Sequence, residues 1–168
     1  MRLAIARNMK NSCRQIASLT NFMEADMTEA MLKAEGLKAQ GIKISVTAMV
    51  IKACAYALSE NPVVNTELLE ATDEILFRKA KHIGCAVDVE DGLLVPVIRD
   101  ADQKSVIQIS TEIAELSALA REGKLSARQS QGGTFTVTSV GMLDIDFFTP
   151  IISYPQTAIL GIGRIKTL

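Results

Sequence analysis

Hydroxyl side chains repeat along one glycine-led segment, Gly132–Gly141, which reads GGTFTVTSVG. Alternation along a strand places the side chains of Thr134, Thr136 and Thr138 on one face. A hydroxyl at the end of such a strand can donate a hydrogen bond to the oxyanion that develops when a carbonyl carbon is attacked. Threonine is also an ordinary strand residue, and spacing alone favours that plainer interpretation.

The other reactive residue types are weaker candidates. His82 is the only histidine, and a lone histidine in a strand is more often a structural residue than a general base. Cys85 alternates with apolar neighbours, so we expect it to fill core space rather than to act as a nucleophile. The acidic residues at 88–91 fall at a turn, where carboxylates are solvated, and we predict no metal site there. The segment Gly161–Gly163 lacks the third glycine and the helix of a dinucleotide-binding motif.

The composition is that of a globular protein. Of the 168 residues, 48% are hydrophobic and 22% charged, and the formal net charge is -1. These values exclude a disordered or collagen-like chain, and the lack of a basic stripe argues against nucleic-acid binding. Three scattered cysteines without a C-x-x-C pair argue against a disulfide framework and a zinc site. We expect one domain spanning residues 1–168.

Neither a membrane span nor a signal peptide is expected. No apolar run approaches the ~20 residues that a transmembrane helix needs, and residues 1–10 lack the apolar stretch and the cleavage site of a signal peptide. The expected location is therefore the cytoplasm, with no membrane partner. The apolar bias of the chain favours contacts between subunits.

Helical periodicity occurs in several segments. Helices are predicted at residues 2–12, 28–41, 45–59 and 106–122, with one helical turn at 125–131. Thr28 and Ser45 are the expected N-caps of the second and third helices. Gly36 and Gly41 are expected to weaken and then end the second, and Asn61-Pro62 to end the third.

Strand-like patterns separate these helices. Strands are predicted at residues 75–77, 82–87, 93–98, 134–140 and 157–165, and residues 16–27 have an irregular, strand-like pattern. Asp91-Gly92 is a hairpin-type turn signal. Mixed helices and successive strands predict an α+β, or layered α/β, domain.

Blocks of sequence from one end of the chain to the other resemble a single family. They are RLAIARNM at 2–9, ADMT at 25–28, KISV at 43–46, IKA at 51–53, NP at 61–62 with Asn65, IGCAV at 83–87, GLLVPVIRDAD at 92–102, GGTFTVTSVG at 132–141 and FTPII at 148–152. In their order and spacing they resemble the catalytic domain of the dihydrolipoamide acyltransferases, the core components of 2-oxo acid dehydrogenase complexes. The resemblance implies a fold related to that of chloramphenicol acetyltransferase, with a mixed sheet packed by helices.

The resemblance also implies a reaction, in which an acyl group moves between the thiols of dihydrolipoamide and coenzyme A. Both are substrates, and no bound cofactor is expected. A thiol of pKa ~8.5 is mostly protonated at neutral pH, so a base must take its proton as it attacks the thioester carbonyl. In this family a Ser or Thr hydroxyl in the F-T-x-[ST] strand stabilises the oxyanion, which implies that role for Thr138. Coenzyme A contacts carry over to Ser45, Asp88 and Ser139, and the family often has Asn at the last of these positions.

The family's base is the histidine of a C-terminal H-R-x-x-D-G motif, which does not occur up to Leu168. The chain is therefore expected to be a C-terminally incomplete catalytic domain without lipoyl or peripheral-subunit-binding domains, and to be inactive alone. A non-catalytic scaffold subunit of the same complex is the alternative.

The resemblance further implies an assembly. The family's active site lies at the interface of a trimer, and trimers build cubic or dodecahedral cores. The implied partners are further copies of the chain, lipoyl domains carried on another domain or chain, and the other components of the complex. The acyl group stays open, with acetyl slightly favoured by the loop at residues 16–20.

Overall fold

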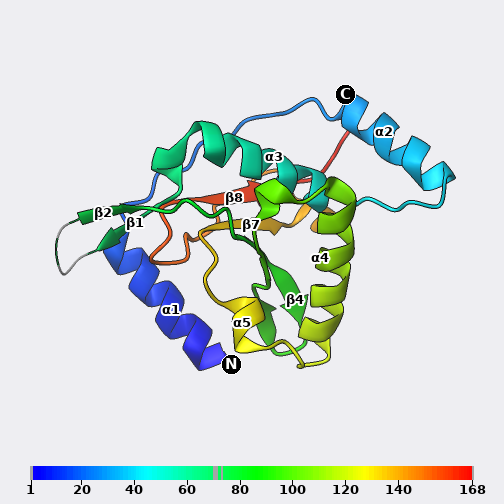
Figure 1. The fold of residues 1–168 in the computed structure, drawn as a ribbon. Helices are drawn as coiled ribbons and strands as arrows, with labels where there is room; N and C mark the ends of the chain where they lie inside the picture. Colours follow the sequence, from blue (N-terminus) through cyan, green and yellow to red (C-terminus); the bar gives the residue numbers. More distant parts are fainter. Residues whose placement is uncertain (1, 70–71, 73, 168) are drawn as a thin grey trace.

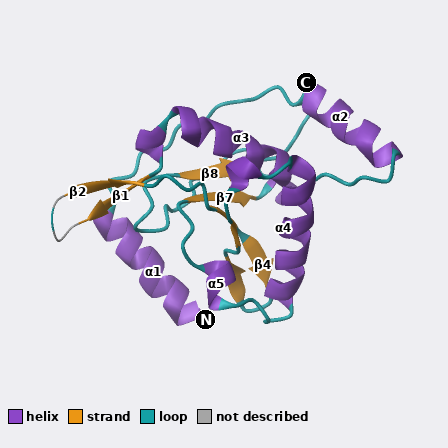
Figure 2. Ribbon diagram, in the orientation of Figure 1, coloured by secondary structure: helices purple, strands orange, loops and turns teal. Residues whose placement is uncertain are grey.

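The computed structural model describes residues 2–69, 72 and 74–167. Its helices are α1 (Arg2–Gln15), α2 (Thr28–Ala39), α3 (Val46–Glu60), α4 (Val106–Arg121) and the short α5 (Ala127–Ser130) (Figure 2). Single 3-10 turns form η1 (Pro62–Val64), η2 (Ala101–Gln103) and η3 (Gly141–Leu143). No helix in the described part of the chain is both long and apolar enough to span a bilayer.

A mixed four-stranded sheet occupies the middle of the molecule (Figure 1). Its order is β6-β3-β7-β8, formed by β6 (Val97–Ile98), β3 (Ile83–Cys85), β7 (Phe135–Ser139) and β8 (Ile159–Ile162). Strand β7 is parallel to both of its neighbours, whereas β6 is antiparallel to β3. Two antiparallel pairs accompany this sheet, β1 (Thr66–Leu69) with β2 (Glu74–Phe77) and β4 (Val87–Val89) with β5 (Gly92–Leu94). The predicted α+β architecture, a mixed sheet packed by helices, is confirmed.

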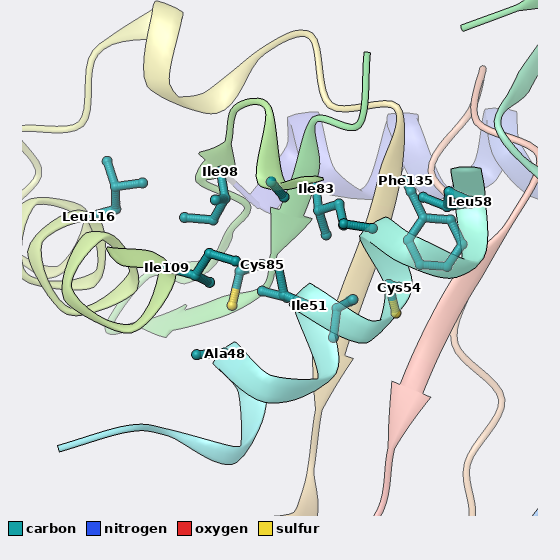
Figure 3. Packing of buried hydrophobic residues seen from close by; sticks show 13 residues of the cluster. Ala48, Ile51, Cys54, Leu58, Ile83, Cys85, Ile98, Ile109, Leu116 and Phe135 are labelled. Atoms are coloured by element: carbon teal, nitrogen blue, oxygen red, sulfur yellow. The ribbon is translucent and has the colours of Figure 1, made fainter. Parts of the chain in front are cut away.

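The core lies between the sheet and two helices, α3 and α4. Ile51 of α3, Ile83 of β3 and Ile109 of α4 are all 0% exposed and point toward one another (Figure 3). Burying an aliphatic side chain of this size stabilises the fold by about 1.5–3 kcal/mol. This cluster therefore holds β3 and β7 in place beneath the helices.

Both core helices begin at a capped residue. The Ser45 Oγ accepts a hydrogen bond from the Ala48 amide at 3.1 Å, which confirms Ser45 as the N-cap of α3. At the start of α4, Ser105 and Gln108 form a capping box, in which each side chain bonds to the other residue's backbone amide. A cap of this kind stabilises a helix by about 1 kcal/mol.

The N-terminal third differs from its prediction in two ways. Residues 16–27 form no regular structure, because no strand in the described chain pairs with them. The N-cap of α2 is Met27 rather than Thr28, since the Asp26 carboxylate accepts hydrogen bonds from the Thr28 amide and hydroxyl. Gly36 lies inside α2, and the helix ends at Ala39, before Gly41. The helix buries none of its residues, and Figure 1 shows it standing apart from the sheet.

Two predicted strands are each divided in the structure. The segment 82–87 is split at Ala86, whose amide donates to the Val137 carbonyl while the chain leaves the central sheet for β4. The segment 93–98 is split before Pro96, which has no amide proton to continue a strand ladder. The predicted turn at Asp91-Gly92 is confirmed between β4 and β5.

The remaining strand predictions agree with the structure, with one omission. The predicted strands at 75–77, 134–140 and 157–165 correspond to β2, β7 and β8 with changed ends. Strand β1 was not predicted, because its sequence TELL has neither an apolar alternation nor a flanking turn signal.

Candidate functional site

Thr138 lies at the C-terminal end of β7, the strand at the centre of the parallel part of the sheet. It is in register with Gly161 on the parallel strand β8. Its side chain is partly exposed, and its hydroxyl makes no hydrogen bond with the residues that the structure describes. This donor is therefore free for a ligand.

The other two threonines on this face of β7 hold the backbone together. The Thr136 hydroxyl is buried and donates to Gln156 Oε1 at 2.7 Å, and Gln156 Nε2 donates in turn to the Gly133 carbonyl at 2.9 Å. Thr134 is also buried, and its Oγ1 accepts from the His82 amide at 3.3 Å. Of the three threonines, Thr138 alone has a hydroxyl uncommitted to any described residue.

The chain beyond β7 turns back and packs closely on the chain beyond β8. The Val140 amide donates to the Ile162 carbonyl at 3.0 Å, and the Arg164 amide donates to the Ile145 carbonyl at 2.9 Å. A Cβ added to Gly163 would lie 2.2 Å from the Asp146 carbonyl oxygen, so only glycine fits there. These contacts fix the end of β7 against its neighbour.

Charged side chains also join the segment that follows β7 to the segment that follows β8. The Arg164 guanidinium donates to both carboxylate oxygens of Asp146, at 2.6 and 3.1 Å, and to Asp144 at 2.7 Å. These hydrogen bonds from Arg164 lower the pKa of the Asp146 carboxyl below its ordinary value of 3.8. Asp144 has a left-handed backbone, with φ of 59°, which carries the chain around the turn.

The ring of Phe148 covers the face of the sheet next to Thr138. A Cβ added to Gly161 would lie 2.7 Å from Phe148 Cζ, so the ring occupies the place of a side chain at that position. Residues in register on neighbouring parallel strands present their side chains to the same face. The ring therefore lies on the face of the sheet to which the Thr138 hydroxyl belongs.

Ser139 and Ser45 lie toward the same end of the core. Ser139 belongs to the face of β7 that carries Phe135 in the core, and Figure 3 places Phe135 near Leu58, at the far end of α3. Strand β7 therefore ends toward the beginning of α3, where Ser45 lies exposed. The Ser45 hydroxyl caps the helix, and its amide donates to Ser110 Oγ at 3.1 Å.

Asp88, the fourth predicted residue, projects from β4. It is exposed and in register with Leu93 of β5. Within the described residues, no hydrogen bond or ion pair joins any two of Thr138, Ser139, Ser45 and Asp88. Thr138 and Ser139 are adjacent on β7 but belong to opposite faces of the sheet. Ser45 lies toward the same end of the core as Ser139, and Asp88 lies on a separate two-stranded sheet.

The contacts of the single histidine, His82, and the burial of two cysteine thiols are those of structural residues. His82 Nδ1 accepts a hydrogen bond from the Asp100 amide at 3.1 Å and lies 3.6 Å from Asp100 Oδ1. Burial raises the pKa of the Cys54 and Cys85 thiols to about 11, so both are protonated at neutral pH. The expectations of a structural histidine and a core-filling Cys85 agree with these contacts. Among the described residues, no three His, Cys, Asp or Glu side chains gather into a cation site.

A hollow of about 540 Å³ lies elsewhere on the described surface. It is bounded by α4, α5 and the end of β6, with Leu116, Leu119 and Arg128 among its lining residues. None of the four predicted residues lines it. This hollow is therefore separate from the predicted site.

Three residues of this region were not predicted: Phe148, Gln156 and Arg164. The glycines at 161 and 163 could have indicated the close approach of another segment, since strand glycines often mark such places. The local sequence does not predict the hydrogen-bond partners of Gln156 and Arg164, because each bonds to residues about 20 positions away.

Comparison with known proteins gives one consistent result. The family described as 2-oxoacid dehydrogenases acyltransferase (catalytic domain) matches residues 1–168. The dihydrolipoyllysine-residue acetyltransferase component of the pyruvate dehydrogenase complex of Bacillus subtilis is 43% identical over 98% of the chain, which spans 38% of that relative's length.

Two solved structures have the same fold. Azotobacter vinelandii dihydrolipoamide acetyltransferase, studied for the roles of a serine, a histidine and an asparagine in its catalytic mechanism, matches with a TM-score of 0.93 and 42% identity, over 96% of this chain and 68% of that one. The cubic core of a pyruvate dehydrogenase multienzyme complex matches with a TM-score of 0.94 and 41% identity, over 97% of this chain and 69% of that one.

The mixed sheet, its two covering helices and the hydroxyl-rich central strand define an α+β domain of the acyltransferase type. The chain belongs to the family of 2-oxoacid dehydrogenase acyltransferase catalytic domains.

Proposed function

We propose that the protein transfers an acyl group, acetyl in the first instance, between dihydrolipoamide and coenzyme A in a 2-oxo acid dehydrogenase complex. The free hydroxyl of Thr138 carries this proposal, because it is a donor at a strand end with no protein partner among the described residues. Membership in the acyltransferase family supports it. The relatives named above are called acetyltransferases, so the scaffold alternative is not favoured.

In the proposed step, the sulfur of one thiol attacks the thioester carbonyl carbon while a base takes the thiol proton. The carbonyl oxygen becomes an oxyanion, and the Thr138 hydroxyl donates a hydrogen bond to it. The intermediate then collapses, the old carbon–sulfur bond breaks, and the departing thiolate receives a proton. One such donor contributes about 100- to 1,000-fold to the rate.

His82 is not the base in this proposal, because its Nδ1 is held by the Asp100 amide. The resemblance gives that role to the histidine of the H-R-x-x-D-G motif, which these 168 residues do not contain. Coenzyme A and the lipoyl group take part as substrates. We propose Ser45, Asp88 and Ser139 as coenzyme A contacts, on the basis of the resemblance alone for Asp88 and with the support of position for the two serines.

The assembly belongs to the same proposal. One of the two solved structures named above is a cubic core, and we propose that this chain also forms trimers that associate further. Exposed apolar side chains agree with such contacts, including Leu19 and Met23 of the N-terminal segment and Met142 beyond β7. Sedimentation of the purified protein would measure the assembly, and cell fractionation would test the expected cytoplasmic location.

The deciding experiment measures acetyl transfer from acetyl-coenzyme A to dihydrolipoamide by the protein in its full natural length. Thr138→Val, which replaces the hydroxyl by a methyl group, should lower kcat by about 100- to 1,000-fold and leave both KM values nearly unchanged. Thr138→Ser is the matched control, since it keeps the donor, and should retain most of the turnover.

Two outcomes would reject the proposal. Wild-type turnover in Thr138→Val would remove the hydroxyl from the reaction. If the wild-type protein assembles and binds coenzyme A but transfers no acetyl group, the enzyme hypothesis is rejected in favour of the scaffold subunit. For the coenzyme A contacts, Ser139→Ala should raise the KM for coenzyme A without changing the KM for dihydrolipoamide.

A further inference from the structure

Arg164 is the most highly connected charged residue near the proposed site. Its guanidinium makes three hydrogen bonds to two carboxylates, a bidentate pair to Asp146 and a single bond to Asp144. Asp144 and Asp146 both follow β7, whereas Arg164 follows β8. The side chain therefore ties together the two segments that leave the parallel centre of the sheet.

Backbone contacts make this connection stiff. The Arg164 amide donates to the Ile145 carbonyl, between the two aspartates, at 2.9 Å. A Cβ on Gly141 would lie 2.6 Å from the Gly163 carbonyl oxygen, so the two segments touch through their backbones. With this spacing, a shift of residues 141–146 moves residues 162–164 as well.

The connection reaches Thr138 by two short routes. The first runs from Val140, two residues beyond Thr138, whose amide donates to the Ile162 carbonyl at 3.0 Å. The second runs through Phe148, whose ring lies against Gly161, the residue in register with Thr138. Val140 precedes and Phe148 follows the residues that Arg164 holds, Asp144 to Asp146.

We propose that Arg164 is a positioning residue, which fixes the orientation of the Thr138 hydroxyl by clasping Asp144 and Asp146. This inference rests on the proposed role of Thr138 in acyl transfer. The guanidinium is the suitable group, because its planar donors match a carboxylate with two parallel hydrogen bonds, whereas an ammonium is a point charge. Arg164 itself touches no reacting atom in this assignment.

The first test measures, independently of activity, whether the hydrogen bonds of Arg164 with Asp144 and Asp146 (the clasp) hold the end of β7 in place. In Arg164→Gln, the Val140 amide should lose protection from hydrogen exchange, while the Ala86 amide, bonded to the Val137 carbonyl earlier on β7, should keep it. Arg78→Gln is the matched control, since Arg78 is also a partly exposed arginine paired with a carboxylate, that of Glu67, on the β1–β2 pair. It should leave the Val140 amide protected.

The second test measures how loss of the clasp changes kcat and KM in the full-length protein. A misplaced catalytic group lowers the rate by up to about 100-fold, so Arg164→Gln should lower kcat by about 10- to 100-fold with little change in either KM. Arg164→Lys should recover part of this loss. The double variant Arg164→Gln/Asp146→Asn should be no slower than Arg164→Gln alone, because both changes open the same clasp.

The results separate this inference from the proposed function. An unchanged Val140 exchange rate in Arg164→Gln overturns the clasp, whether or not the wild type is active. Faster exchange with unchanged kcat in an active protein overturns the positioning role. Absence of acetyl transfer by the wild type rejects the proposed function, and with it the role of the clasp in positioning a catalytic hydroxyl. Faster exchange combined with a selective loss of kcat supports the inference.

Discussion

Thr138 and Gly161 are register partners on parallel strands, and the ring of Phe148 covers the glycine on the face that carries the threonine side chain. The candidate donor is thus bordered on one side by an aromatic ring. Such a border reduces access of water to the hydroxyl, and hydrogen bonds to a developing charge are stronger where water is excluded.

The glycines that follow β7 and those on or just beyond β8 should tolerate alanine poorly. In Gly163→Ala the new Cβ would lie 2.2 Å from the Asp146 carbonyl oxygen, which is backbone and cannot rotate away. We expect a loss of about 1–3 kcal/mol in the free energy of unfolding, as for other overpacked sites. Urea denaturation followed by circular dichroism would measure it.

Gly36→Ala is the control for this prediction. Gly36 lies inside α2, where an added Cβ meets nothing within 4 Å. The free energy of unfolding should rise by about 0.5–1 kcal/mol, because alanine loses less backbone entropy in a helix than glycine. Equal effects of the two substitutions would contradict the close approach at Gly163.

The buried pair of Thr136 and Gln156 gives a second prediction. Thr136→Val removes the donor to Gln156 Oε1 without changing the volume, and leaves a buried acceptor unpaired. The expected cost is about 1–3 kcal/mol in the free energy of unfolding. Thr136→Ser, which keeps the hydroxyl, should cost less, and the reverse order would show that packing rather than the hydrogen bond dominates.

The three cysteines should differ in reactivity. Burial raises the pKa of Cys54 and Cys85 to about 11 from an ordinary value of 9.0, which lowers their thiolate fraction about 100-fold at pH 8. Cys13 is exposed on α1. Iodoacetamide followed by mass spectrometry should therefore modify Cys13 alone in the folded protein and all three in urea. Rapid labelling of Cys85 in the folded state would contradict its place in the core.

The clasp of Arg164 predicts a dependence on pH. Its hydrogen bonds lower the pKa of Asp146 in the folded state below 3.8, so the carboxylate contributes stability above that pH and loses it as the pH falls through the lowered pKa. The difference in unfolding free energy between wild type and Arg164→Gln should accordingly shrink on acidification. Thermal unfolding at a series of pH values from about 6 downward, compared between the two proteins, would measure this, and a constant difference would refute it.

Much of the fold could be predicted because its signals are local. Ser45 caps α3, the helical periodicity from Val106 predicts α4, and Asp91-Gly92 forms the turn between β4 and β5. Each of these depends on residues within one or two turns of one another. Two of the failures have non-local causes. Residues 16–27 have a strand-like pattern but no described strand beside them, and the chain leaves the central sheet at Ala86, whose amide donates to the Val137 carbonyl.

The candidate site was only partly predictable for the same reason. Motif and resemblance singled out Thr138, and the described residues leave its hydroxyl free at a strand end. Phe148, which borders the residue in register with it, and Arg164, which is linked to it only through other residues, come from segments whose relation to β7 depends on close packing at the glycines 161 and 163. Such packing has no signature in the spacing of any single segment.

The attachment of α1 has a consequence for synthesis of the protein on the ribosome. Within the span of α1 that the structure describes, Ser12 is the one buried residue, and its hydroxyl accepts the Tyr154 amide at 3.0 Å, 142 positions later in the chain. Because chains emerge with the N-terminus first, this contact of the first helix cannot form until Tyr154 has left the exit tunnel. The first helix is therefore made long before its partner. In nascent chains stalled before Tyr154, we expect a protease to cleave α1 more readily than it does in the folded protein.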